Sequence, residues 1–302
     1  MFIKQHISVL DILRWNWQMI LFALVTVTAM TVLYLELLRP YIEVSVAVMS
    51  SLGTAISFFV GFITAQAYDR WWEARKIWGT LVNDSRSFSR MVVTMLPPGD
   101  GTTDVTPIRE RLVRRHIAFI YAVKERLRGE STAEYLGYLN ETDVARIRGV
   151  GHPGNILLEL QGADIDAAER SGRLDVIRMA QFNDMLSRFS TSMGMAERIK
   201  TTVFPPHYAA MVRLSIWIFM VVFPVALSEV IGYWAIVYSF LLGTIFLLVF
   251  RVGQSLLDPF DGKPGDTPMS SIVRTIEINL LEQIGQKDLP SPVEPIAGRY
   301  LP

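Results

Sequence analysis

Uncharged stretches long enough to cross a membrane alternate with charged stretches along this chain. Residues 15–35, 44–68 and 230–250 contain no Asp, Glu, Lys or Arg, and residues 214–228 form a fourth, shorter stretch. A helix needs about 20 apolar residues to span the hydrocarbon core of a bilayer. We therefore predict four transmembrane helices, and we expect Pro224 to kink the third.

The long interval between the second and third apolar stretches shows helical periodicity, and nothing in it alternates as a strand would. Over residues 108–127 apolar side chains recur at three- and four-residue steps. Clusters of Pro and Gly interrupt the pattern and divide the interval. These signals predict helices at 69–95, 107–128, 155–169 and 174–202, followed by an amphipathic helix at 269–283 and an extended end.

The expected fold is all-α, with a large cytoplasmic helical region attached to four transmembrane helices. Nothing breaks the chain between residues 63 and 70, so the second transmembrane helix should continue into that region, and we expect the same of the third, where only Pro205-Pro206 intervenes. The division we expect is 1–67, 68–207, 208–257 and 258–302, in which the first and third segments cross the membrane. Every Lys and Arg except Arg39 then lies on one side, which makes both termini cytoplasmic.

Composition argues against several classes of function. The formal net charge is zero, so no attraction to nucleic acid is implied, and the absence of cysteine excludes thiolate catalysis and Cys-ligated metals. The four histidines are scattered, and no catalytic acid pair or triad stands out, so we expect neither an enzyme nor a cofactor nor a metal site. Residues 149–154 match G-x-G-x-x-G, but no strand precedes them, and we interpret them as a turn between helices.

The second apolar stretch is unusual because small and polar side chains recur along one side of it. Ser50, Thr54, Ser57, Gly61 and Thr64 follow three- and four-residue steps, and Phe58 and Phe62 stand four apart on an adjoining line. Small-residue helix packing explains this pattern. A water-filled axis shared by several copies, where phenylalanine rings gate by dewetting, explains it as well. The pattern alone favours packing.

Several motifs resemble the bestrophin family of ion channels in its prokaryotic branch. They are Ser57-Phe-Phe-Val-Gly-Phe62, Arg70-Trp-Trp72, Asn83-Asp-Ser-Arg86, Phe204-Pro-Pro-His-Tyr208, Asp258-Pro-Phe260 and Arg274-Thr-Ile-Glu-Ile-Asn-Leu-Leu281. The resemblance implies a homopentamer in the membrane, with self and lipid as partners, around one central pore. It implies a neck at Phe58 and Phe62 with Thr54 one turn earlier, where relatives usually carry an aliphatic residue, and a lower cytoplasmic constriction at Ile177.

Two charge patterns bear on ion permeation. On the outer side, Glu36, Glu43 and Glu229 against Arg39 sum to −2 per chain, which slightly favours monovalent cations over chloride. Animal bestrophins carry an acidic calcium clasp after the fourth crossing, and here only Asp258, Asp261 and Asp266 stand in that segment. Calcium takes six to eight oxygen ligands, so we expect opening that does not require calcium.

The function expected is therefore passive conduction of small monovalent ions. The alternative is a membrane scaffold whose cytoplasmic helices bind a protein partner and whose second transmembrane helix merely packs.

Overall fold

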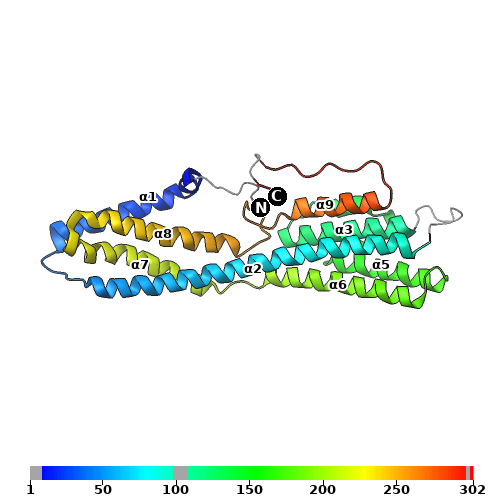
Figure 1. Cartoon of the computed structure of the whole chain (residues 1–302), viewed down its shortest axis with the longest axis horizontal. Coiled ribbons are helices and arrows are strands. Elements are labelled where there is room, and N and C mark those ends of the chain that lie inside the picture. Colours follow the sequence, from blue (N-terminus) through cyan, green and yellow to red (C-terminus); the bar gives the residue numbers. More distant parts are fainter. Residues whose placement is uncertain (1–8, 98–107, 297–299, 302) are drawn as a thin grey trace. The chain divides into compact units, whose positions relative to one another are not determined.

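The computed structural model describes residues 9–97, 108–296 and 300–301, and this part of the chain is almost entirely helical. Figure 1 shows its elements, which are α1 (Val9–Leu33), the π-helical turn η1 (Tyr34–Leu38), α2 (Val46–Met95), α3 (Ile108–Arg128), η2 (Glu134–Tyr138), α4 (Glu141–Ile147), α5 (Pro153–Arg170), α6 (Val176–Thr201), α7 (Pro206–Ile231), η3 (Gly232–Trp234), α8 (Ala235–Leu256) and α9 (Met269–Gln283). Within these ranges the only strand-like pairing is an isolated bridge between Ile296 and Tyr300.

The helices form two compact units. One unit, here called the apolar unit, is built from the chain up to Trp71 together with Val203–Leu257, and the polar unit is built from Trp72–Thr202 together with the chain from Asp258 onward. Helix α2 is continuous from Val46 to Met95 and contributes residues to both units. The expectation that the second transmembrane helix continues beyond the apolar stretch is thus confirmed.

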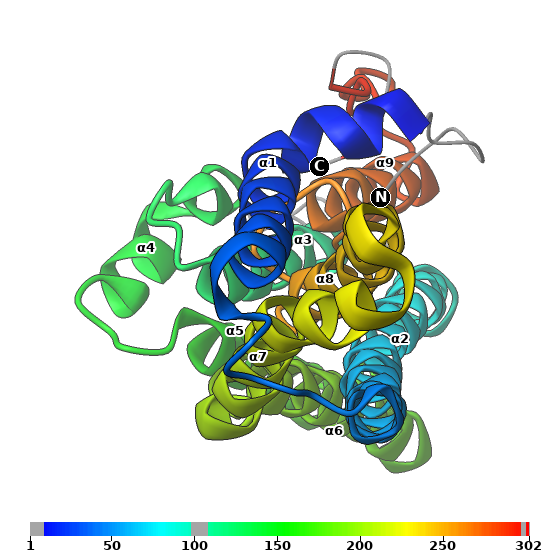
Figure 2. The ribbon, with the colours of Figure 1, turned by 90° about the vertical axis from the view of Figure 1, so that its left-hand side faces the viewer.

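Among the described residues, three stretches are long and apolar enough to cross a membrane, namely Leu10–Leu38, Val46–Met95 and Pro206–Leu256. The last stretch comprises α7 and α8 joined by the short η3 turn, and the two helices lie side by side with α1 packed against them (Figure 2). The predicted Pro224 lies inside α7, where the Ser228 hydroxyl donates to its carbonyl oxygen. A proline has no N–H, so the carbonyl of Met220, four residues earlier, receives no helical hydrogen bond from position 224.

The helices predicted from periodicity in the polar unit are present with small shifts in their ends, and two short elements were not predicted. These are η2 and α4, which follow α3. The expectation that the third transmembrane helix is also continuous with the preceding helix is wrong. Helix α6 ends at Thr201, and α7 begins only at Pro206, because Pro205 and Pro206 together end one helix and begin the next.

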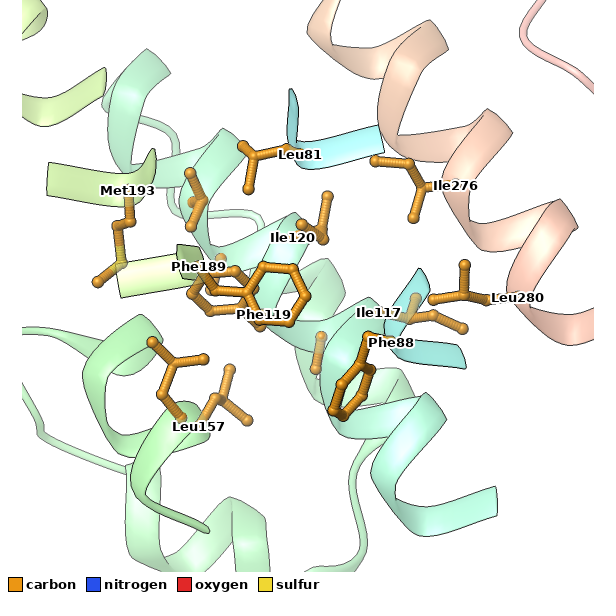
Figure 3. Packing of buried hydrophobic residues seen from close by; sticks show 14 of the residues in the cluster. Leu81, Phe88, Ile117, Phe119, Ile120, Leu157, Phe189, Met193, Ile276 and Leu280 are labelled. Atoms are coloured by element: carbon orange, nitrogen blue, oxygen red, sulfur yellow. The ribbon is translucent and has the colours of Figure 1, made fainter. Parts of the chain in front are cut away.

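The core of the polar unit joins α2, α3, α5, α6 and α9. Phe88, Phe119 and Phe189 come from α2, α3 and α6, and their rings meet in the centre, while Leu280 of α9 covers one side (Figure 3). All four side chains are fully buried. Burial of each such side chain stabilises the fold by roughly 1.5–3 kcal/mol, so these apolar positions determine which face of each helix points into the core.

His116 lies inside this aromatic core. Its ring centroid is 4.3 Å from that of Phe189, and its Nε2 is 2.9 Å from the Ser85 hydroxyl oxygen. Since Ser85 donates its own hydrogen to the Leu81 carbonyl, His116 must donate from Nε2. Complete burial lowers the pKa of His116 to about 3, so the ring is neutral in the fold. The expectation that this histidine is structural is confirmed.

The turn at residues 149–154 connects α4 to α5. Gly149 adopts a φ of +79°, and the Nδ1 atom of His152 accepts the backbone N–H of Asn155 to cap α5. No strand precedes the turn. The interpretation of this glycine motif as a connection between helices is therefore confirmed.

Candidate pore-lining face of α2

Helix α2 presents two different faces within the apolar unit. Ile56, Val60 and Ile63 are fully or almost fully buried, and they belong to the core formed with α1, α7 and α8. Their spacing of four and three residues places them along one side of the helix. The opposite side carries Phe58 and Phe62 and is the face on which the family resemblance places the neck.

The phenylalanine rings on that face have little cover within the chain. The exposed fraction is 72% for Phe58 and 48% for Phe62. Phe62 has a partner in Tyr208 at the start of α7, with ring centroids 5.9 Å apart in an edge-to-face arrangement, and Phe59 contacts the same tyrosine at 6.4 Å. No local pattern indicated this aromatic contact, because the two elements are far apart along the chain. Tyr208 thus holds the Phe62 ring in place, while the Phe58 ring projects from the helix.

Three hydroxyl groups in the apolar half of α2 donate hydrogen bonds within the helix. Thr54 donates to the Ser50 carbonyl at 3.0 Å, Ser57 to the Gly53 carbonyl at 2.9 Å, and Thr64 to the Val60 carbonyl at 2.8 Å. This bonding to the preceding turn lets a hydroxyl sit in an apolar environment without an unpaired donor. Its oxygen can still accept a hydrogen bond, so exposed Thr54 can face either water or a neighbouring helix.

Small residues bring α2 close to its neighbours, but they are not the residues that the sequence pattern grouped together. A Cβ atom on Gly53 would lie 3.1 Å from the Phe219 ring of α7, and one on Gly253 of α8 would lie 2.9 Å from the Thr64 hydroxyl oxygen. By contrast, nothing lies within 4 Å of a Cβ placed on Gly61. The small and polar residues that the sequence placed along one side of α2 therefore do not share one environment, because Thr64 packs inside the unit and Gly61 faces outward.

Two of the three predicted outer acids form contacts that join η1 to the end of α7 and to η3. Glu229 accepts a hydrogen bond from Tyr34 at 2.8 Å and forms an ion pair with Arg39 at 3.3 Å. Glu36 accepts a hydrogen bond from the Tyr233 hydroxyl. Glu43 is exposed in the segment that leads into α2. The charge sum of −2 is unchanged, but Arg39 neutralises Glu229 locally, so Glu36 and Glu43 carry the excess.

The other predicted constriction residue, Ile177, stands at the start of α6 in the polar unit. Its exposed fraction is 74%, and that of the neighbouring Val176 is 61%. Asp175 caps the helix by accepting the Arg178 backbone N–H at 3.0 Å. Val176 and Ile177 therefore form a small exposed apolar patch at the start of this helix.

The three predicted aspartates after α8 are held by neighbours in the same segment and in α6. Asp258 pairs with Lys200 at 2.6 Å, and Asp261 pairs with Lys263, which lowers the pKa of Asp261. Burial raises the pKa of Asp266 to about 6, although one of its oxygens accepts the Lys263 backbone N–H at 2.8 Å. Across the described residues, no group of three or more His, Asp or Glu side chains is arranged to hold a metal ion.

Comparisons with known proteins agree on one group of relatives. A family model described as Bacterial/Fungal Bestrophin protein matches residues 6–282. The voltage-dependent anion channel-forming protein YneE of Escherichia coli (strain K12) is 32% identical over 255 residues, covering 84% of this chain and 82% of that protein. The similarly named protein mll4386 of Mesorhizobium japonicum is 25% identical over 236 residues, covering 78% of this chain and 74% of that protein. A crystal structure of a bacterial bestrophin homologue from Klebsiella pneumoniae has a TM-score of 0.83 and 28% sequence identity, covering 89% of this chain and 98% of that one.

Proposed function

This chain belongs to the bacterial and fungal bestrophin family, and we propose that five copies of it form one channel for small monovalent ions across the bacterial inner membrane. The resemblance noted in the sequence is confirmed by the family match. Relatives in sequence are named as channel-forming proteins, and a solved bacterial bestrophin homologue shares the fold, so the chain is an ion channel and not an enzyme.

The observation that carries the proposal is the outward face of α2. The inner face of this helix is packed, whereas the described part of the chain leaves Phe58, Phe62, Thr54 and Gly61 of its outer face exposed. If copies of this helix surround a common axis, the rings of Phe58 and Phe62 from each copy narrow it. Such an apolar constriction controls ion flow by excluding or admitting water.

The proposed topology has four crossings and places both termini in the cytoplasm. Helices α1, α7 and α8 and the first part of α2 cross the bilayer, and the basic residues that flank them follow the positive-inside bias. Segments 1–67 and 208–257 are then the membrane parts, and 68–207 and 258–302 form the cytoplasmic part. Ile177 forms the second, cytoplasmic constriction in this arrangement, with its aliphatic side chain facing the ion path.

The charge of the permeant ion is tested separately, because two observations favour different answers. The excess of Glu36 and Glu43 on the outer side attracts cations, and we propose that monovalent cations are preferred. The names of the relatives favour anions. Reversal potentials in asymmetric NaCl distinguish the two, since a shift toward the sodium equilibrium potential supports the proposal and a shift toward that of chloride contradicts it.

Calcium is not required for opening in this proposal. Lys200 and Lys263 already occupy the carboxylates of Asp258 and Asp261, which leaves too few oxygen ligands for the ion. Currents from the purified protein in lipid should therefore persist after calcium is chelated. Loss of all current on chelation would contradict this part of the proposal.

The neck assignment is tested by ion flux through liposomes. Phe58→Ala and Phe62→Ala should each raise the flux at matched reconstitution, because a smaller side chain widens and wets the constriction. Phe22→Ala is the matched control, since the Phe22 ring on α1 is also 59% exposed but lies outside the proposed pore. Unchanged flux in both neck variants would reject the neck, and absence of flux in the wild-type protein would favour the scaffold function.

A further inference from the structure

A cavity in the polar unit has no role in the proposed channel. Its volume is about 200 Å³, and it lies between the first half of α3 and the segment that joins η2 to α4. Glu110, Arg111, Arg114 and Arg115 of α3 line one side, while Asn140 and Asp143 line the other. Guanidinium groups are donors only, so such a lining is suited to an acceptor ligand.

One arginine in the lining is a rigid, buried part of the wall. The Arg115 side chain is 7% exposed, donates to both oxygens of Asp143 at 2.6 and 2.7 Å, and reaches Asp164 at 2.7 Å and the Leu160 carbonyl at 3.0 Å. These bonds engage all three of its nitrogens. They also occupy the carboxylate of Asp143, so that acid offers a ligand little competition for the remaining donors.

Unlike Arg115, the Arg114 side chain can exchange one of its hydrogen-bond partners for a ligand. Its Nε bonds to Glu110 at 2.7 Å and its Nη2 bonds to Gln286 at 3.2 Å, so these bonds use two of its five N–H groups. Both Arg114 and Glu110 are about one-third exposed, and an exposed ion pair one helical turn apart contributes little to stability. A ligand anion can therefore replace Glu110 at small cost.

Asn140 adds a second directed donor on the facing wall. Its Oδ1 accepts the Asp143 backbone N–H at 2.8 Å, which caps α4 and orients the amide. The amide nitrogen of Asn140 is then the atom that can donate a hydrogen bond to a ligand. An arginine fork opposite an amide donor is suited to the planar or tetrahedral oxygens of a carboxylate or a phosphate.

We propose that this cavity binds a small oxyanion, such as a carboxylate or phosphate group, which displaces Glu110 from Arg114 and links α3 to the η2–α4 segment. The cavity is smaller than the roughly 300–1,000 Å³ typical of sites for drug-sized ligands, so the ligand is a small metabolite or a free ion. The site is separate from the residues proposed to conduct ions, and its occupancy is measurable without any current.

The test is isothermal titration calorimetry on the full-length protein in detergent, with inorganic phosphate and acetate as separate probes. Arg114→Gln should weaken binding by about tenfold or more, and Arg114→Lys should weaken it less, since the charge stays but the fork is lost. Glu110→Gln should tighten binding because it removes the competing carboxylate. The ratio of the phosphate and acetate affinities identifies which oxyanion the site prefers.

Control variants come from an exposed ion pair with the same helical spacing. Arg188→Gln and Asp184→Asn on α6 should leave binding unchanged, since Arg188 and Asp184 pair at 3.1 Å outside the cavity. The proposal is overturned if neither probe gives saturable heat in the wild-type protein, or if Glu110→Gln does not tighten binding. The second criterion holds even if the arginine variants fail to fold.

Discussion

The contact between Gly253 of α8 and Thr64 of α2 is the point at which one added methyl group should matter most. A Cβ on Gly253 would lie 2.9 Å from the Thr64 hydroxyl oxygen and 3.2 Å from its Cα atom. The first of these separations is shorter than real contacts allow. Thr64 cannot easily turn away, because its hydroxyl is bonded to the Val60 carbonyl at 2.8 Å and its side chain is β-branched. Gly253→Ala therefore forces α8 away from α2.

The magnitude follows from two opposing terms. Overpacking of a well-packed contact costs about 1–3 kcal/mol. Replacing a helical glycine by alanine returns about 1 kcal/mol through helix propensity. Gly194→Ala on α6 is the matched control, because nothing lies within 4 Å of a Cβ at that position. The propensity term is common to both variants, so the difference between them isolates an overpacking cost of about 1–3 kcal/mol.

Thermal unfolding in detergent, followed by tryptophan fluorescence, measures this difference. For large domains 1 kcal/mol corresponds to about 2–4 °C, so Gly253→Ala should melt several degrees below Gly194→Ala. Adding Thr64→Ala to Gly253→Ala should recover part of the loss, because it removes the nearest atom and leaves only the close approach to the backbone of residue 64. If Gly253→Ala were as stable as Gly194→Ala, the described packing of α2 against α8 would be wrong.

Three further predictions concern buried ionisable groups of the polar unit. Asp266→Asn should stabilise the protein near pH 7, because burial raises the pKa of Asp266 to about 6. Ionisation of Asp266 therefore costs up to about 3 kcal/mol of folding free energy once the pH rises above the folded pKa. The melting curves of wild type and variant should converge toward pH 4. His116 acts in the opposite sense, because its pKa is lowered to about 3 and the unfolded chain binds the proton first. This group contributes up to about 5 kcal/mol of stability, which is lost as the pH falls from about 6.5 toward 3. His116→Gln should flatten that loss in acid melting experiments. Asp143→Asn should cost about 3–5 kcal/mol in denaturant unfolding because it leaves Arg115 buried without its bidentate partner, and a cost below about 1 kcal/mol would show that this pair is not buried as described.

Much of the fold could be predicted from the sequence because long helices carry strong periodic signals. The uncharged stretches and the Pro and Gly clusters indicated most helix positions in both units. The elements η2 and α4 were missed because five and seven residues are too short to show a period. Asn140 was an available signal, since its side chain caps α4 and asparagine is a preferred helix cap.

The candidate pore face was predicted only in part. The spacing of Phe58 and Phe62 pointed to one side of α2, but the spacing alone could not say which small residues pack inside the unit. Gly253 and Tyr208 approach α2 from elements more than 100 positions away in the sequence, and such pairs leave no local pattern. The Arg115 ion-pair cluster was missed for the same reason, because its partners come from α4 and α5.

The central claim, that α2 from several copies lines a shared aqueous axis, is tested most directly by cysteine accessibility. The chain contains no cysteine, so every introduced thiol is the only one present. A water-soluble methanethiosulfonate reagent should irreversibly change the current of Gly61→Cys and Phe58→Cys, and it should leave Val249→Cys on α8 unaffected. Unaltered currents in both α2 variants, with thiols that stay unmodified, would contradict the account.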